Sequence, residues 1–95
     1  MTPSIIDIID SRGLHCDHRL LLVLLRELGG EVSLKEFFAE VWRKGWYRWD
    51  FRSYPGYVKN TMVSPYSNEL AEDIEYLEAK GLVKIEDNKI RLVEQ

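Results

Sequence analysis

The stretch LVKIEDNKIRLV, from Leu82 to Val93, decides the C-terminal part of the fold, because its side chains sort into a β-hairpin in a single register. Asp87 and Asn88 are residue types that favour a two-residue hairpin turn. With that turn, the facing pairs are Ile85 with Ile90, Val83 with Leu92, Lys84 with Arg91 and Glu86 with Lys89. The first two pairs form an apolar side and the last two a charged side. The stretch therefore predicts two antiparallel strands within residues 82–93.

A helix is predicted directly before this hairpin, from Pro65 to Lys80. Ser64 followed by Pro65 is typical of a helix start, with a cap before a proline at the first position, and Gly81 is a typical stop. The apolar stripe of the helix consists of Leu70, Ile74 and Leu77. Its acids are predicted mostly on the solvent side, as ordinary surface charges and not as a catalytic site; they are Glu69, Glu72, Asp73, Glu75 and Glu78.

Two further helices are predicted upstream. Asp17 is a good N-cap for a helix that runs to Gly29. The apolar run LLLVLL leaves this helix no polar face through its middle, so it is either central in the core or shared with a second subunit. The SLKE motif that begins at Ser33 is a capping box. It opens a helix that Gly45 ends and whose apolar positions are Leu34, Phe37, Phe38, Val41 and Trp42. Residues 31–32 leave room for a very short strand.

Residues 1–13 are predicted to form an N-terminal extension. The isoleucines at positions 5, 6, 8 and 9 are interrupted by aspartates at a spacing that suits one face of a short helix. Gly13 would end that helix. Isoleucine also favours strands, so a strand stays open as the alternative.

Residues 45–63 are predicted to be a long basic and aromatic insertion with a turn at Pro55 and Gly56. WYRWDF alternates like a strand, and YPGYVKNTM has room for one helical turn. If WYRWDF is extended, one side carries Tyr47, Trp49 and Phe51, which we expect to be packed, and the outward side carries Trp46, Arg48, Asp50 and Arg52. The basic side then meets either nucleic acid, or solvent, or a second subunit.

The composition bounds the class of protein. Ninety-five residues can bury one hydrophobic core, which predicts a single domain over residues 1–95. The formal net charge is −3, yet the segment from Arg43 to Lys59 carries five cations against Asp50. The longest apolar run is too short to cross a bilayer, and the N-terminus does not resemble a secretory signal, so no membrane association is expected. A single cysteine favours a reducing cytoplasm.

Two pieces of the chain resemble the winged helix-turn-helix family. LLVLLRELGGEVSLKEFFAEV is similar to its first two helices with a short strand between them, and SNELAEDIEYLEAKGLVKIEDNKIRL is similar to its third helix and its wing. Together the pieces cover about half of the chain. SPYSNELAEDIEYLEAKGLV also resembles a segment of small uncharacterised prokaryotic winged-helix proteins. The resemblance implies an α+β fold, mainly α, with a three-helix core and a C-terminal two-stranded wing at residues 82–93.

What the family implies about function is binding of double-stranded DNA, with the third helix in the major groove and the wing beside the backbone. By position, the start of the third helix would reach base edges through Tyr66, Ser67 and Asn68, and the wing would meet phosphates through Lys84, Lys89 and Arg91. The sequence departs from the family in the 45–63 insertion. It also departs in the outward face of the third helix, where carboxylates are repelled by phosphates.

We therefore predict a small cytoplasmic transcriptional regulator that binds DNA as a homodimer. Phosphates would be neutralised by the wing together with Arg43, Lys44, Arg48, Arg52 and Lys59. The alternative is a winged-helix module that binds a protein partner through its acidic third helix and aromatic segment. No enzymatic activity and no cofactor are expected. HCDH, from His15 to His18, lacks the second pair of ligands that a structural zinc site needs, so no metal is expected either.

Overall fold

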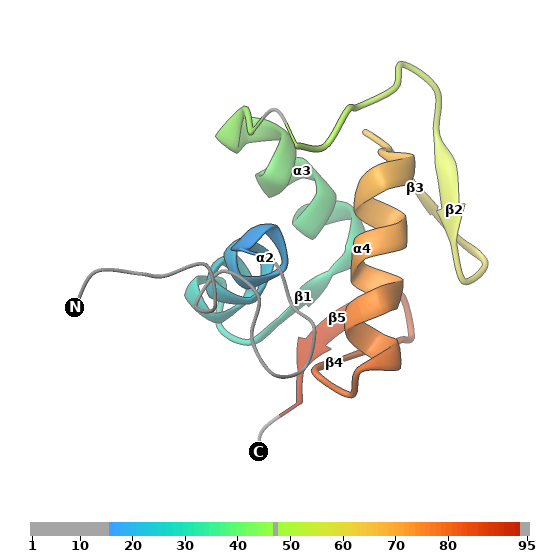
Figure 1. The fold of residues 1–95 in the computed structure, drawn as a ribbon. Helices are drawn as coiled ribbons and strands as arrows, with labels where there is room; N and C mark the ends of the chain where they lie inside the picture. Colours follow the sequence, from blue (N-terminus) through green and yellow to red (C-terminus); the bar gives the residue numbers. More distant parts are fainter. Residues whose placement is uncertain (1–15, 47, 94–95) are drawn as a thin grey trace.

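The computed structural model describes residues 16–46 and 48–93 of the chain. They form, in chain order, α2 (Cys16–Glu27), β1 (Glu31–Ser33), α3 (Leu34–Lys44), β2 (Gly56–Val58), β3 (Thr61–Val63), α4 (Asn68–Ala79), β4 (Val83–Glu86) and β5 (Lys89–Leu92). The result is an α+β fold. The helices pack beside a three-stranded antiparallel sheet, and a second, two-stranded sheet lies next to α4 (Figure 1). The predicted extension at residues 1–13 lies outside the described part of the chain.

The β4–β5 hairpin has the predicted register. Ile85 faces Ile90, Val83 faces Leu92, Lys84 faces Arg91 and Glu86 faces Lys89. Asp87 and Asn88 both have positive φ, 55° and 65°, which is the backbone of a type I′ turn and is tolerated best by Asn, Asp and Gly. The short strand expected near residue 31 is confirmed as β1, which pairs with β5 so that the sheet order is β1-β5-β4. This pairing ties the C-terminal hairpin to the connection between α2 and α3.

The beginning and end of α3 agree with the predicted helix. The Ser33 hydroxyl oxygen accepts a hydrogen bond of 3.1 Å from the backbone N–H of Glu36, and Gly45 ends the helix with a φ of 69°. Four of the five predicted apolar positions are buried, namely Leu34, Phe37, Phe38 and Val41. Trp42 was expected in the same stripe but is 57% exposed. It lies at the edge of the stripe, where the last turn of the helix extends beyond the core.

The start of α4 differs from the prediction. The helix begins at Asn68 and not at Pro65, because Ser67, and not Ser64, is its N-cap. The Ser67 hydroxyl oxygen accepts a hydrogen bond of 3.2 Å from the N–H of Leu70. The apolar stripe of Leu70, Ile74 and Leu77 is buried as predicted. In α2, the predicted cap Asp17 lies inside the described helix, so it is not the N-cap.

The insertion at residues 45–63 contains a β-hairpin that is not among the predicted elements. Lys59 and Asn60 have φ values of 46° and 69° and form a type I′ turn between β2 and β3, in the stretch that has room for one helical turn. WYRWDF alternates like a strand, but among its described residues only Arg52 forms a β-bridge, an isolated one to Tyr66. The segment is irregular because Trp46 and Trp49 both pack toward the core, a spacing of three that an alternating strand does not allow.

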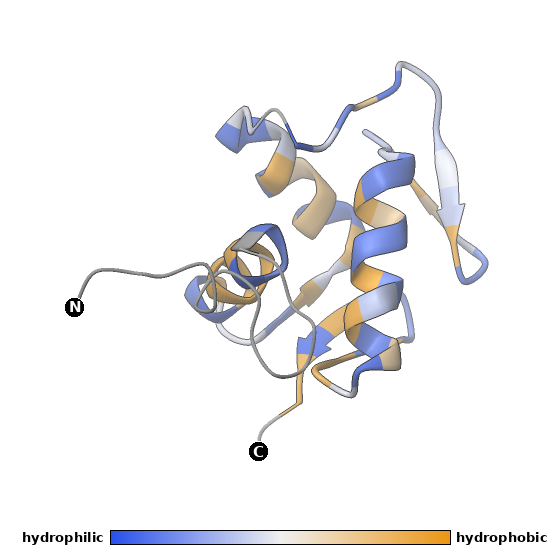
Figure 2. Ribbon diagram, viewed as in Figure 1, coloured by the Kyte–Doolittle hydropathy of each residue, from blue (hydrophilic) through white to orange (hydrophobic). Residues whose placement is uncertain are grey.

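The core joins all of these elements. Side chains of α2, α3 and α4 meet the inner face of the β4–β5 hairpin, and Val58 and Val63 from the β2–β3 hairpin are also fully buried. The β2–β3 hairpin is therefore part of the core and not an appendage. Figure 2 shows hydrophobic segments on the sides of the helices that face one another and hydrophilic segments along the outward turns of α4. None of the described helices is long and apolar enough to cross a membrane.

Candidate interaction surface

The arginines of the insertion are paired with carboxylates of the same molecule. The Nε of Arg48 donates to Asp17 at 2.9 Å, and its Nη2 lies 3.5 Å from Asp73. Arg52 contacts Asp50 at 3.1 Å and Glu69 at 3.4 Å. The proximity of Glu69 raises the pKa of the Arg52 guanidinium. Both arginines are thus paired with acids of α2 or α4.

Of the other three cations of this segment that are predicted to contact DNA, two are also paired within the molecule. Arg43 contacts Glu36 and Glu40 on its own helix. Lys59 contacts Glu78 at 2.6 Å and donates to the carbonyl of Ile85 at 3.2 Å. Lys44 is exposed at the end of α3.

On the charged side of the β4–β5 hairpin, positively and negatively charged residues lie next to one another. Lys89 lies 3.7 Å from Glu31, and Arg91 lies 3.6 Å from Glu86. Lys84 is exposed beside Arg91 on the facing strand. A shallow hollow of about 110 Å³ is lined by Glu31, Lys84, Glu86, Asp87, Lys89 and Arg91. Three cations face three acids here, so the hairpin offers no uninterrupted positive surface.

The residues predicted to read bases occupy three different environments. Ser67 is fully buried, and its hydroxyl serves as the cap of α4. The Tyr66 ring stacks on Phe38 with centroids 6.0 Å apart, and its hydroxyl donates to the exposed Asn68 at 3.0 Å. Base reading by Ser67 would require the first turn of α4 to open, because no part of that side chain is exposed.

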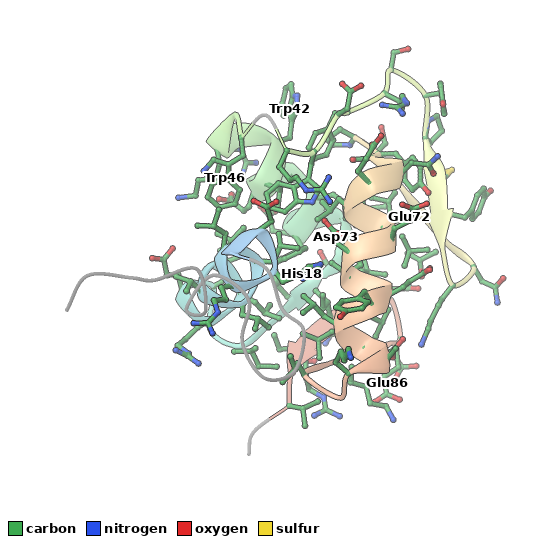
Figure 3. The ribbon with its side chains drawn as sticks, in the orientation of Figure 1. His18, Trp42, Trp46, Glu72, Asp73 and Glu86 are labelled. Carbon is green, nitrogen blue, oxygen red and sulfur yellow. The ribbon has the colours of Figure 1, made fainter. Side chains whose placement is uncertain are left out.

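The outward face of α4 is acidic. Glu72 and Glu75 are exposed and Glu69 is half-buried. In Figure 3, Glu72 lies on the side of α4 next to the β2–β3 hairpin. Burial raises the pKa of the Tyr66 phenol, and the negative charges of Glu75 and Glu72 raise it further. The exposed carboxylates of Glu72 and Glu75 make this edge of α4 negative, which disfavours phosphate and favours cationic groups.

Exposed apolar side chains flank this acidic face. Tyr57 and Met62 are directly opposite one another on β2 and β3, and they are 65% and 48% exposed. They share the outer side of the hairpin because Val58 and Val63 occupy the inner side. Tyr54 is also exposed, and it lies close enough to Tyr66 to affect the pKa of that phenol. We call Tyr54, Tyr57, Met62, Glu72 and Glu75 the α4–hairpin surface.

A buried polar cluster holds the insertion against the helices. The carboxylate of Asp73 accepts a hydrogen bond of 2.6 Å from the indole N–H of Trp49 and lies 3.4 Å from Nε2 of His18. Figure 3 shows His18 and Asp73 between α2 and α4. The His18 ring also stacks on Tyr76 at 4.8 Å. The buried carboxylate of Asp73 is therefore surrounded by polar partners, as buried polar groups in folded proteins are. The cluster thus stabilises the packing of the insertion against the helices.

The acids of α4 are predicted to lie mostly on the solvent side, and Asp73 is an exception to that prediction. Asp73 is only 8% exposed. It lies three residues after Leu70 and four before Leu77, which puts it within the apolar stripe of α4. That spacing was the signal in the sequence. The donors that make burial of the carboxylate acceptable come from α2 and from the insertion, and their positions were not predicted.

The HCDH motif lies partly outside the described residues, because His15 and the side chain of Cys16 are not among them. Within the described residues, no group of three or more His, Cys, Asp or Glu side chains is arranged to hold a metal ion. Comparisons with protein-family models, with curated proteins and with solved structures find no match for this chain.

Proposed function

We propose that this chain is a winged-helix protein. The support is the order of its elements, in which α2, β1, α3 and α4 are followed by a hairpin, together with a sheet in which the strand between the first two of these helices pairs with the last strand. On this assignment α4 is the third helix of the motif and β4–β5 is its wing, while β2–β3 is an insertion before the third helix.

The function that the geometry supports best is binding of a protein partner that carries basic side chains, through the α4–hairpin surface. The observation that carries this proposal is that the helix which a DNA-binding member would insert into a groove presents Glu72 and Glu75 instead of cations. The exposed Tyr57–Met62 pair beside it supplies the apolar contact that protein interfaces use at their centre. The single cysteine fits a site of action in the reducing cytoplasm.

DNA binding is the second candidate, in the role of a transcriptional regulator. It is favoured by the wing, where Lys84, Lys89 and Arg91 are exposed near the turn at residues 87–88. Binding through these cations would leave α4 outside the groove. It would also require the ion pairs with Glu31 and Glu86 to be exchanged for phosphates. No enzymatic step is proposed.

One experiment separates the two candidates. The full chain is titrated with two fluorescent probes, a 30-base-pair random duplex and a peptide of alternating Arg, Leu and Lys residues, each at low and at moderate salt. The variants are Glu72→Gln with Glu75→Gln on α4, and Lys84→Gln with Lys89→Gln on the wing.

The protein-partner proposal expects the α4 variant to lose peptide binding, because the removed charges face the basic probe. The wing variant should bind the peptide as the wild type does. Glu27→Gln, an exposed acid at the end of α2, serves as a matched control and should also bind normally. Duplex binding that collapses with salt, is lost in the wing variant and is unchanged in the α4 variant would overturn the proposal in favour of DNA.

A further inference from the structure

The end of α3 carries an aromatic cleft that shares no residue with the α4–hairpin surface. The cleft has a volume of about 300 Å³ and is lined by Val41, Trp42, Gly45, Trp46, Trp49, Asp50 and Phe51. It lies where Gly45 ends the helix with a φ of 69°. Figure 3 shows Trp42 and Trp46 near this end of α3.

Four of the seven residues that line the cleft are aromatic. Trp49 is 2% exposed and belongs to the core. Its indole N–H is already donated to Asp73, so the N–H is not available to a ligand. Trp46 is tilted by 54° against Trp49 at a centroid distance of 5.6 Å. Trp42 is largely exposed and Phe51 is half-buried. Because these rings are not parallel, they can contact a single bound group from several directions.

The charge of the cleft favours a cation. Asp50 lines it with a carboxylate side chain that is 79% exposed. The C-terminal end of α3, at Gly45, contributes the negative end of the helix dipole. Arg43 and Lys44 lie in the last turn of α3 but do not line the cleft. Aromatic faces attract ammonium and guanidinium groups, with tryptophan the strongest of the rings.

We propose that this cleft binds an arginine side chain of the protein partner. A guanidinium is planar and stacks on indole rings, and it can also donate two parallel hydrogen bonds to a carboxylate such as Asp50. Asp50 is now paired with Arg52 at 3.1 Å, so the incoming guanidinium would share or replace that contact. A nucleobase would also stack on the rings, but its phosphate would be repelled by Asp50.

The assignment of the arginine to a protein partner rests on the proposed function, but the site itself is tested without a partner. The probe is N-acetyl-arginine amide, added to the full chain while the indole N–H signals of the tryptophans are followed by NMR. The matched control probe is N-acetyl-citrulline amide, which has nearly the same shape and no charge. Adenosine monophosphate tests the nucleobase alternative.

We expect saturable shifts of the Trp42 and Trp46 signals with the arginine probe and none with citrulline. Trp42→Ala should weaken arginine binding by about two- to thirty-fold, the range that one exposed or desolvated cation–π contact spans. Asp50→Asn should weaken it as well, whereas Tyr57→Ala, an exposed aromatic on the other surface, should not. The side chains of Trp42, Asp50 and Tyr57 are all exposed, so the fold is expected to persist in each variant.

Equal shifts with arginine and citrulline, or binding of adenosine monophosphate in preference to arginine, would overturn the proposal. Failure here is distinguishable from failure of the proposed function. Glu72→Gln with Glu75→Gln should leave the arginine probe bound while abolishing binding of the basic peptide. Loss of arginine binding in that α4 variant would show that the probe binds the acidic helix, and would also overturn the assignment.

Discussion

The indole N–H of Trp49 donates a 2.6 Å hydrogen bond to the carboxylate of Asp73, across 24 positions of sequence. Both side chains are buried, and the same carboxylate is also approached by His18 and Arg48. This relationship fixes the start of the aromatic insertion against α4. It therefore also fixes the floor of the aromatic cleft, because Trp49 belongs to both.

Trp49→Phe should destabilise the protein by about 1–3 kcal/mol, since it keeps most of the ring but leaves a buried carboxylate short of one donor. Urea denaturation measures the free energy of unfolding. The control is Trp42→Phe, whose side chain is mostly exposed and whose change should stay within about 0.5 kcal/mol. Equal losses in the two variants would mean that the hydrogen bond to Asp73 adds nothing.

Acid sensitivity should arise in part from Glu78. Burial acts to raise its pKa, but the hydrogen bonds from Lys59 and from the N–H of Ile85 lower the pKa by more, to below the ordinary 4.5. A carboxyl with a depressed folded-state pKa stabilises the fold above its unfolded pKa, and this contribution is lost as the pH falls through the folded value. The free energy of unfolding should thus decrease below a pH of about 4.5.

Glu78→Gln should reduce the slope of stability against pH in that acidic range, as measured by urea denaturation between pH 3 and pH 7. Lys59→Gln should reduce the slope partially, because it removes the ammonium and keeps the N–H of Ile85. An unchanged slope in Glu78→Gln would show that other carboxyl groups cause the acid sensitivity.

Gly56→Ala should be destabilising by about 1–3 kcal/mol, the usual cost of overpacking. A Cβ at this position of β2 would clash with the ring of Tyr66, which is itself stacked on Phe38. Thermal unfolding followed by circular dichroism measures the effect. Ser53→Ala, an exposed substitution in the same insertion, is the control. A Gly56→Ala variant as stable as the wild type would mean that Tyr66 moves aside at little cost.

Charge reversal on α4 should create DNA binding if the winged-helix assignment is right. Glu72→Lys with Glu75→Lys changes the formal net charge from −3 to +1, since each substitution adds two units. The altered face is the one that the motif would place in a groove. Duplex affinity should rise and its salt slope should steepen by about one unit per new phosphate contact. The control is Glu27→Lys with Glu36→Lys, which makes the same charge change away from α4; equal affinities would count against α4 as the groove helix.

Dimerisation, predicted from the isoleucine-rich N-terminus and from the apolar run in α2, stays a prediction. The structure adds that Leu20 and Val23 are 40% and 49% exposed on this helix, while Leu21, Leu24 and Leu25 face the core. Light scattering at high micromolar concentration should give the mass of a dimer, and Val23→Glu should give that of a monomer. A monomeric wild type would remove the prediction.

The sequence by itself determined the local structure wherever a residue pattern has one solution. The register of β4–β5 follows from two apolar pairs around Asp87 and Asn88, and the start of α3 follows from its serine cap. The Lys59–Asn60 turn was missed because its flanking strands are only three residues long and lack a clear alternation. These are local outcomes, set within a few residues of the chain.

Only the tertiary structure decided the electrostatics of the surface. The arginines of the basic segment form ion pairs in the folded protein. Arg48 and Arg52 contact Asp17, Asp73 and Glu69, which are far from them in the sequence. Likewise Asp73 is buried, and its carboxylate contacts Trp49 and His18 from other parts of the chain. Charge interactions depend on distance in space and on burial, and neither quantity is encoded within a short window of sequence.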